Sequence, residues 1–359
     1  MKKIFALSAM LVVAGAAFAA SGPVKPRYVV LPPHNTYNVS SPATLQEWTG
    51  TLLSGYTFNM VGTDPSKTNT TTTVNVYIIP VNICVTPSGG TKTCFDPKTK
   101  QSNGASAITN VLNSPIFQNQ DYVQTGTDIG NTQYEDAFQR SNFWTDVMTN
   151  TNYHVLLKPI LVPEQTVNVP SSEGTIATDF GVTAANVDID YLDTLITAGL
   201  PKLKALTPAS LALIMTYDTY LTEGGCCIGG YHSANGTQSY SEFTYAAPGS
   251  GGIIPFSADV SALSHELGEW LDDPLTPTQN NSPCGILEVG DPIENEKGTH
   301  NYGDYTYTLN GFTYHLQDLA TMHYFGQSPN TVNGTNFTFQ GQNGVLPGEG
   351  QIAECSFGS

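Results

Sequence analysis

Residues 257–274 read SADVSALSHELGEWLDDP and predict the helix around which the rest of the chain is arranged. Ser257 is a typical N-cap residue, Asp259 is expected in the first turn, and Pro274 ends the helix. Apolar side chains recur at helical spacing and form one face: Val260, Leu263, Leu267, Trp270 and Leu271. The other side carries one imidazole and four carboxylates between positions 265 and 273.

The polar side chains of this helix gather on neighbouring parts of its surface. His265 and Glu269 lie about 40° apart around the axis, and Asp272 lies about 20° to the other side of His265. Glu266 and Asp273 project about 80–100° round from His265. Because like charges at this spacing repel each other, such a face is costly unless a cation is near.

The segment His265-Glu266-Leu267-Gly268-Glu269 resembles the helix of zincin metallopeptidases. In that family a His-Glu-x-x-His stretch binds zinc, and its glutamate is the general base. The resemblance implies that His265 is a metal ligand and that Glu266 is the base. Glu269 stands where the family has its second histidine, and a carboxylate on the same helix face is a normal zinc donor.

A longer similarity covers residues 225–295. The string Ser-His-Glu-x-x-Glu…Asp-Pro, followed by Glu-x-x-Asp, resembles secreted bacterial proteins of unassigned function and, more weakly, EXORDIUM-like plant proteins. Some zincins take a third ligand from a glutamate about twenty residues downstream, so Glu288 is the first choice here. Asp272, Asp273 and Asp291 are the alternatives, and Asp291 is also a candidate for orienting His265 through its other ring nitrogen.

These resemblances lead to an expected function and to a rival. One zinc ion is the expected cofactor, with calcium as the alternative, and Glu266 would take the proton from a metal-activated water. His232, in a glycine-rich stretch before the helix, is a candidate catalytic residue that stabilises developing charge, or else a structural histidine. The expected protein is a secreted metal-dependent endopeptidase. The rival is a non-catalytic secreted or cell-wall-associated module whose acidic cluster binds calcium or only shapes the fold.

The amino terminus predicts export. Lys2 and Lys3, an apolar run and small residues around position 19 are typical of a signal peptide over residues 1–19. No other stretch is long and apolar enough to predict a membrane span. Residues 20–72 are then an amino-terminal extension, and residues 73–359 are expected to form a single zincin-like catalytic domain.

Six cysteines fit an exported protein with disulfides. Cys84 and Cys94 flank a Pro-Ser-Gly-Gly turn and are expected to bridge a hairpin. The adjacent Cys226 and Cys227 are poorly placed to pair with each other, so Cys284 and Cys355 are the preferred partners. A zinc site built on Cys226 and Cys227 is the alternative.

The charge balance excludes one class of partner. There are 13 Lys and Arg against 30 Asp and Glu, so polyanions such as nucleic acids are not expected to bind. The expected partner is an extracellular peptide or protein substrate, and a monomer is favoured.

Hydrophobic periodicity predicts an α+β or mixed α/β fold, with a mixed sheet compatible with a zincin-like core. The order before the key helix is strand, helix, helix, strand, helix, strand, followed by one further strand. The predicted ranges are 74–85 (strand), 106–112 and 134–148 (helices), 153–162 (strand), 187–200 (helix), 211–220 and 239–246 (strands). A hairpin is expected at 305–316, around Asn310-Gly311.

Overall fold

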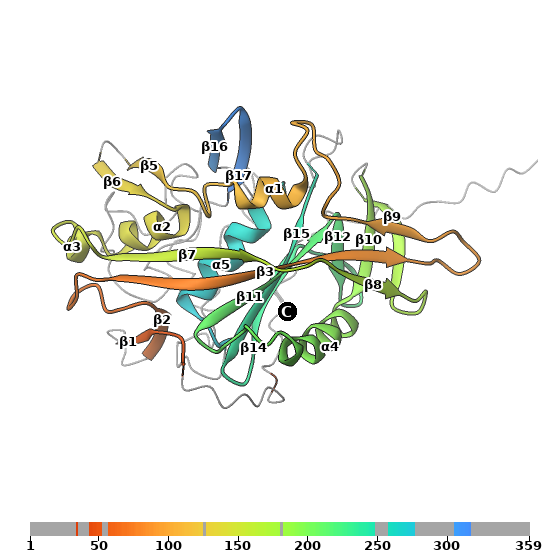
Figure 1. Ribbon diagram of the computed structural model, residues 1–359, viewed down its shortest axis with the longest axis horizontal. Coiled ribbons are helices and arrows are strands. Elements are labelled where there is room, and N and C mark those ends of the chain that lie inside the picture. The colour runs from red at the N-terminus through yellow and green to blue at the C-terminus, as the bar shows by residue number, and fades with distance from the viewer. Residues whose placement is uncertain are drawn as a thin grey trace, which may run out of the picture.

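A computed structural model describes residue 34 and residues 43–51, 57–124, 127–179, 182–247, 258–276 and 305–316 (Figure 1). The predicted signal peptide, Ser257, Glu288, Asp291, Cys284 and Cys355 lie outside these residues. The described chain combines helices with mixed β-sheets, which confirms the α+β class. Within this part of the chain, no helix has the length and apolar character needed to cross a membrane.

The largest sheet has seven strands and is centred on β3 (Thr71–Val85). On one side of β3 lie β11 (Ser210–Tyr217), β15 (Gln238–Tyr245) and the edge strand β14 (Gly230–Asn235). On the other side β7 (His154–Leu161) pairs with the first half of β3, and β8 (Gln165–Val169) pairs with the second half. These strands are parallel except β14, while β4 (Thr93–Phe95) also runs antiparallel, beside the end of β3.

The sequence of β3 explains its central place. Its first half alternates exposed and buried residues, and its second half is almost continuously buried, as is typical of a strand covered on both faces. Pro80 lies in the middle of this strand, after the pairing with β7 ends at Ile78 and before the pairing with β8 begins at Val81. A proline has no N–H to donate, so this gap between two neighbours is where β3 tolerates one.

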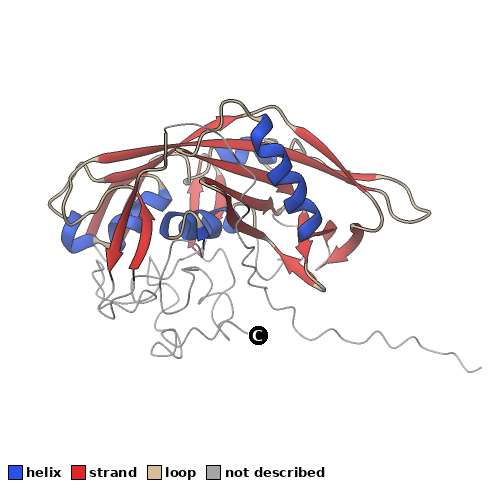
Figure 2. Cartoon of the chain, turned by 90° about the horizontal axis from the view of Figure 1, so that it is seen from below, coloured by secondary structure: helices blue, strands red, loops and turns tan. Residues whose placement is uncertain are grey.

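Two helices cover opposite faces of the sheet at β14. His232 of β14 lies beside Glu266 on α5 (Ser261–Asp272), whereas the hydroxyl of Tyr231 donates to Asp193 on α4 (Ile189–Gly199). Successive residues of a strand point to opposite faces, so α5 and α4 pack on different sides. Figure 2 shows the long strands as a curved layer with several helices on its hollow side.

Smaller elements complete the fold. Helix α5 packs against β14, β15, β17 (Phe312–Leu316), β2 (Thr57–Val61) and α2 (Tyr134–Asn142). Because β2 belongs to the amino-terminal extension, part of that extension contacts the key helix. A four-stranded sheet contains β13 (Cys226–Ile228), β12 (Thr219–Thr222), β10 (Val182–Asp188) and β9 (Gly174–Asp179). The described chain also has three separate two-stranded sheets, β1 (Glu47–Thr51) with β2 (Thr57–Val61), β5 (Gln120–Gln124) with β6 (Thr127–Thr132), and β16 (Tyr305–Leu309) with β17 (Phe312–Leu316). The remaining helices are α1 (Ala107–Leu112), α2 (Tyr134–Asn142), α3 (Trp144–Val147) and the short η1 (Leu200–Lys202).

The key helix begins later than predicted. It starts at Ser261 with Val260 as its N-cap, and Asp259 precedes it with a φ of 37° instead of lying in the first turn. The Asp259 carboxylate accepts hydrogen bonds from the backbone N–H of Val260 and of His315 on β17, and it also pairs with the His315 ring. A short polar residue tolerates this left-handed conformation, and here it anchors the last hairpin instead of extending the helix.

Two other predicted elements are divided in the structure. The helix expected over 134–148 is interrupted at Phe143, so that α2 and α3 are separate. The strand expected over 211–220 breaks at Asp218, which has a φ of 41°, and the chain then passes from β11 into β12 in a different sheet. Hydrophobic spacing continues through both breaks, so periodicity alone does not locate them.

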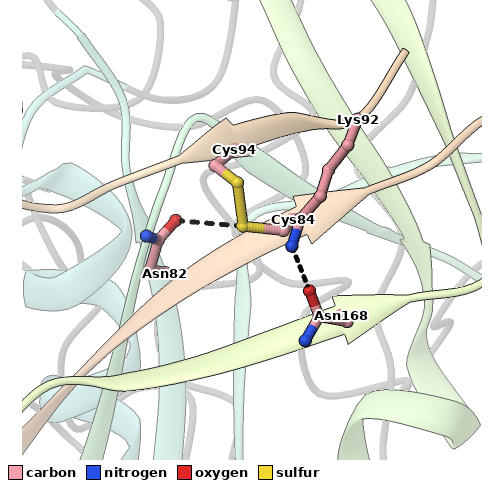
Figure 3. The surroundings of a disulfide bond; sticks show 5 residues. All are labelled: Asn82, Cys84, Lys92, Cys94 and Asn168. Atoms are coloured by element: carbon pink, nitrogen blue, oxygen red, sulfur yellow. Dashed lines mark hydrogen bonds between the residues drawn. A yellow bond between two sulfur atoms is a disulfide. The ribbon is translucent and has the colours of Figure 1, made fainter.

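The hairpin disulfide is confirmed. Cys84 on β3 and Cys94 on β4 are opposite each other in the ladder and joined with an S–S distance of 2.02 Å (Figure 3). Beside it, Nζ of Lys92 donates to Oδ1 of Asn168 on β8. The prediction for the other pair was different, because Cys226 and Cys227 are joined to each other, and the peptide bond between them is cis.

Candidate metal centre

Helix α5 is buried on all sides. Leu263, Leu267 and Trp270 are fully buried in the main core, as the apolar face predicted. The polar residues of the helix are buried as well, with Glu269 2% exposed and Asp272 0% exposed. A solvated acidic face is therefore excluded, and the carboxylates of α5 need partners inside the protein.

Three buried side chains, His232, Glu266 and Glu269, form a group that could hold a metal ion. Each offers one donor atom, and these atoms lie within 4.8 Å of one another. Nδ1 of His232 is 3.6 Å from Oε2 of Glu266 and 3.9 Å from Oε2 of Glu269. His265 joins the group through Glu269, because its Nε2 is 3.1 Å from the same Oε2 atom.

These separations are the right size for one shared ion. Zinc binds nitrogen and oxygen donors at about 2.0–2.2 Å, so neighbouring donors of a tetrahedral site are about 3.3–3.6 Å apart. Of the three pairs, the one at 3.6 Å lies at the upper end of that range, the one at 3.1 Å lies just below it, and the one at 3.9 Å lies just above it. The mixture of imidazole and carboxylate donors also fits zinc or another first-row divalent metal.

A glycine on the edge strand makes room for the group. Gly230 and His232 are two residues apart on β14 and face α5 together. A Cβ atom at position 230 would lie 2.9 Å from Cγ and 3.0 Å from Oε1 of Glu266, so the glutamate lies directly over this glycine. The close approach of strand and helix places Glu266 beside His232.

The predicted site residues do not all meet. His265, Glu266, Glu269 and His232 come together, and the structure adds His232 to the ligand candidates, a role that the sequence analysis had not given it. Asp272 points elsewhere: its Oδ1 accepts a hydrogen bond from Nε2 of Gln139 on α2, at 2.6 Å. Asp273 is the C-cap residue of α5, with its N–H donating to the carbonyl of Glu269.

Two buried glutamates near this group were missed by sequence reasoning. Burial raises the pKa of Glu135 on α2 well above its usual value, and the charge of Asp272 raises it further, while His265 lowers it. Burial also raises the pKa of Glu242 on β15 well above its usual value. The charge of Glu266 raises this pKa further, while the hydrogen bond from Thr216 lowers it. Neither glutamate belongs to a recognisable motif, so only the packing of α2 and β15 reveals them.

Three histidines outside the group pair with aspartates. His34 contacts Asp193, His154 contacts Asp136, and His315 contacts Asp259. Each pair joins segments that are separated in sequence, which is a structural role.

Comparison with known proteins identifies no similar protein. No family model, no curated protein and no solved structure matches the chain. The function is therefore inferred from the residues of the chain themselves.

Proposed function

We propose that this chain is a secreted metal-dependent hydrolase that cleaves peptide bonds. The observation that carries the proposal is the buried meeting of His232 with the His265-Glu266-x-x-Glu269 segment of α5. In the proposed site His265, Glu269 and His232 hold a zinc ion, and Glu266 is the general base. His232 takes the place that Glu288 had in the expected ligand set.

The arrangement of elements supports a zincin-like core. The resemblance of α5 to the zincin helix implied a mixed sheet, and α5 packs on β14 and β15 of such a sheet. The strand before the helix is expected to line the substrate cleft in that family. Here β15 precedes α5, and the adjoining edge strand β14 carries His232.

Each side chain has a distinct task in this proposal. The ion, when bound, polarises a water molecule and the scissile carbonyl. Glu266 lies about 100° round the helix from His265, which directs its carboxylate beside the ligands and not between them. It can therefore accept the proton of the water and return it to the leaving amine. The low dielectric around these buried groups strengthens their interaction with developing charge.

One observation favours a second candidate function. His232 lies closer to Glu266 than to Glu269, at 3.6 and 3.9 Å. If Glu266 is itself a ligand, four protein donors close the site, which is typical of a structural metal centre. The chain would then be a non-catalytic module stabilised by its ion.

Metal analysis and mutagenesis separate these functions. We expect about one zinc per purified chain, and we expect His232→Ala, His265→Ala and Glu269→Ala to lose it. Glu266→Gln should keep the metal but abolish chelator-sensitive cleavage of casein, because the base contacts only the water. His34→Ala is the matched control, since this histidine pairs with Asp193 outside the group. Loss of zinc from Glu266→Gln, together with an inactive wild type, would support the structural centre instead.

A further inference from the structure

A second polar cluster lies between α2 and α5, on the other flank of His265. Glu135 and Gln139 are four residues apart on α2 and share one face of that helix. Gln139 donates its Nε2–H to Oδ1 of Asp272, which fixes this face of α2 against the end of α5. Glu135 is buried on the same face of α2, and the charges of Asp272 and His265 act on its carboxyl group.

This cluster presents oxygen atoms that have no hydrogen-bond partner among the described residues. Both carboxylate oxygens of Glu135, Oδ2 of Asp272 and Oε1 of Gln139 are buried, and they accept no hydrogen bond within this part of the chain. The residues are 0%, 0% and 2% exposed, respectively. An unsatisfied buried acceptor costs roughly 1–3 kcal/mol, and an unpaired charge costs several kcal/mol more. Four such oxygens on two facing helices are therefore a large uncompensated cost.

The nearby groups of the protein do not offset this cost. Glu135 lies in the first turn of α2, where the helix dipole favours a negative charge by at most about 2 kcal/mol. Arg140, the buried cation of the same helix, donates to the backbone carbonyls of Ile129 and Tyr153. The charge of His265 favours an ionised Glu135, but the ring of His265 already lies against Glu269.

We propose that Glu135, Asp272 and the side-chain oxygen of Gln139 bind a hard divalent cation, of the calcium class, between α2 and α5. Calcium takes carboxylate and amide oxygens at about 2.3–2.6 Å in flexible geometry, which suits two carboxylates and one amide from facing helices. The donors contain no nitrogen or sulfur, so zinc is disfavoured here relative to the His232 group.

The calcium site is separate from the zinc group. Around α5, Asp272 lies about 20° to one side of His265, whereas Glu269 and Glu266 lie about 40° and 100° to the other. Helix α2 contacts the first flank and β14 contacts the second. The inference therefore does not depend on the proposed hydrolase function.

The test measures calcium binding to the full mature chain after chelation and removal of the chelator. The wild type, Glu135→Gln and Asp272→Asn are each titrated with calcium alone in a calorimeter. Their thermal unfolding is then measured with and without calcium. Both substitutions keep the side-chain shape and remove the charge. Asp190→Asn is the matched control, because Asp190 is an exposed acid on α4.

We expect calcium to raise the unfolding temperature of the wild type and of Asp190→Asn. Glu135→Gln and Asp272→Asn should each bind calcium on the order of 100-fold more weakly and lose the temperature shift. Both variants should keep the zinc content of the wild type, while Glu269→Ala loses zinc and keeps the calcium response.

The opposite results are equally clear. If both charge-removing variants respond to calcium as the wild type does, or if the wild type does not respond, the proposal is overturned and Glu135 is held as a neutral acid. If one variant does not fold, the other decides the question by the same titration. A response to magnesium or manganese but not calcium would also overturn the assignment of the ion.

Discussion

Replacing Gly230 by alanine tests the packing of Glu266 against β14. The added Cβ would lie 2.7 Å from the carbonyl oxygen of Glu242 and 2.9 Å from Cγ of Glu266. Real Cβ atoms essentially never approach other atoms so closely, so either β14 shifts away from β15 or the Glu266 side chain turns away from His232. Such overpacking costs about 1–3 kcal/mol of unfolding free energy.

Gly229→Ala is the matched control from the preceding residue. There the new Cβ would meet only Cβ of Ala262, at 3.6 Å, which is an ordinary contact. Replacing glycine by alanine also restricts the unfolded chain, but that effect is common to both variants and cancels in the comparison. We therefore expect Gly230→Ala to be less stable than Gly229→Ala by about 1–3 kcal/mol.

Urea denaturation of both variants, in parallel with zinc analysis and the casein assay, checks this prediction. Gly230→Ala should also lose activity if the displaced side chain is the general base. Equal midpoints for the two variants, with equal activity, would refute the view that Glu266 lies over Gly230.

Three further predictions concern parts of the fold away from the zinc group. Burial raises the pKa of Asp218 to about 6, although the hydrogen bond from the N–H of Ala247 lowers it. Because the folded state favours the neutral carboxyl, this contribution to the free energy of unfolding is fully present below pH about 4 and is lost as the pH rises through 6. Asp218→Asn should therefore remove up to about 3 kcal/mol of that decline, measured by urea denaturation at pH 4, 6 and 8, and an unchanged pH dependence would contradict it. Opening the disulfide between Cys84 and Cys94 with a paired Cys84→Ser, Cys94→Ser variant should cost about 2–3 kcal/mol for a sequence separation of 10, again measured in urea, whereas an unchanged midpoint would count against a stabilising crosslink. His315→Ala should lower the unfolding free energy by about 1–3 kcal/mol, because the buried Asp259 loses its ring partner, and a loss below that of the exposed-site control Asp190→Asn would argue against this anchor.

The sequence predicts elements whose signals are local. The strand predicted over 74–85 and the helix predicted over 106–112 are found as β3 and α1, and Ser106 caps α1 by accepting a hydrogen bond from the N–H of Thr109. Asn310 and Gly311 have φ values of 53° and 79°, as expected for an Asn-Gly dipeptide in a two-residue hairpin turn. In each case the deciding interaction lies within a few residues of chain.

Other features depend on contacts that sequence spacing does not encode. The start of α5 moved because Asp259 binds His315, 56 residues away in sequence. His232 enters the candidate zinc group because β14 pairs beside β15 beneath α5, and Glu135 enters the calcium site because α2 packs on α5. The sequence of α5 thus identified three of the four residues of the candidate zinc group, but only Asp272 among the three proposed calcium ligands, and tertiary packing supplied the others.

Because β3 changes its neighbour from β7 to β8, the two halves of this strand can open independently along that edge. Backbone pairing with β7 ends at Ile78 and pairing with β8 begins at Val81, so β8 can separate from β3 without breaking a hydrogen bond of the β7 half. The disulfide between β3 and β4 lies in the β8 half, whereas α2 packs on β7. Amide protons of β8 should therefore exchange with deuterium through local opening, while those of β7 should exchange only when the whole sheet unfolds.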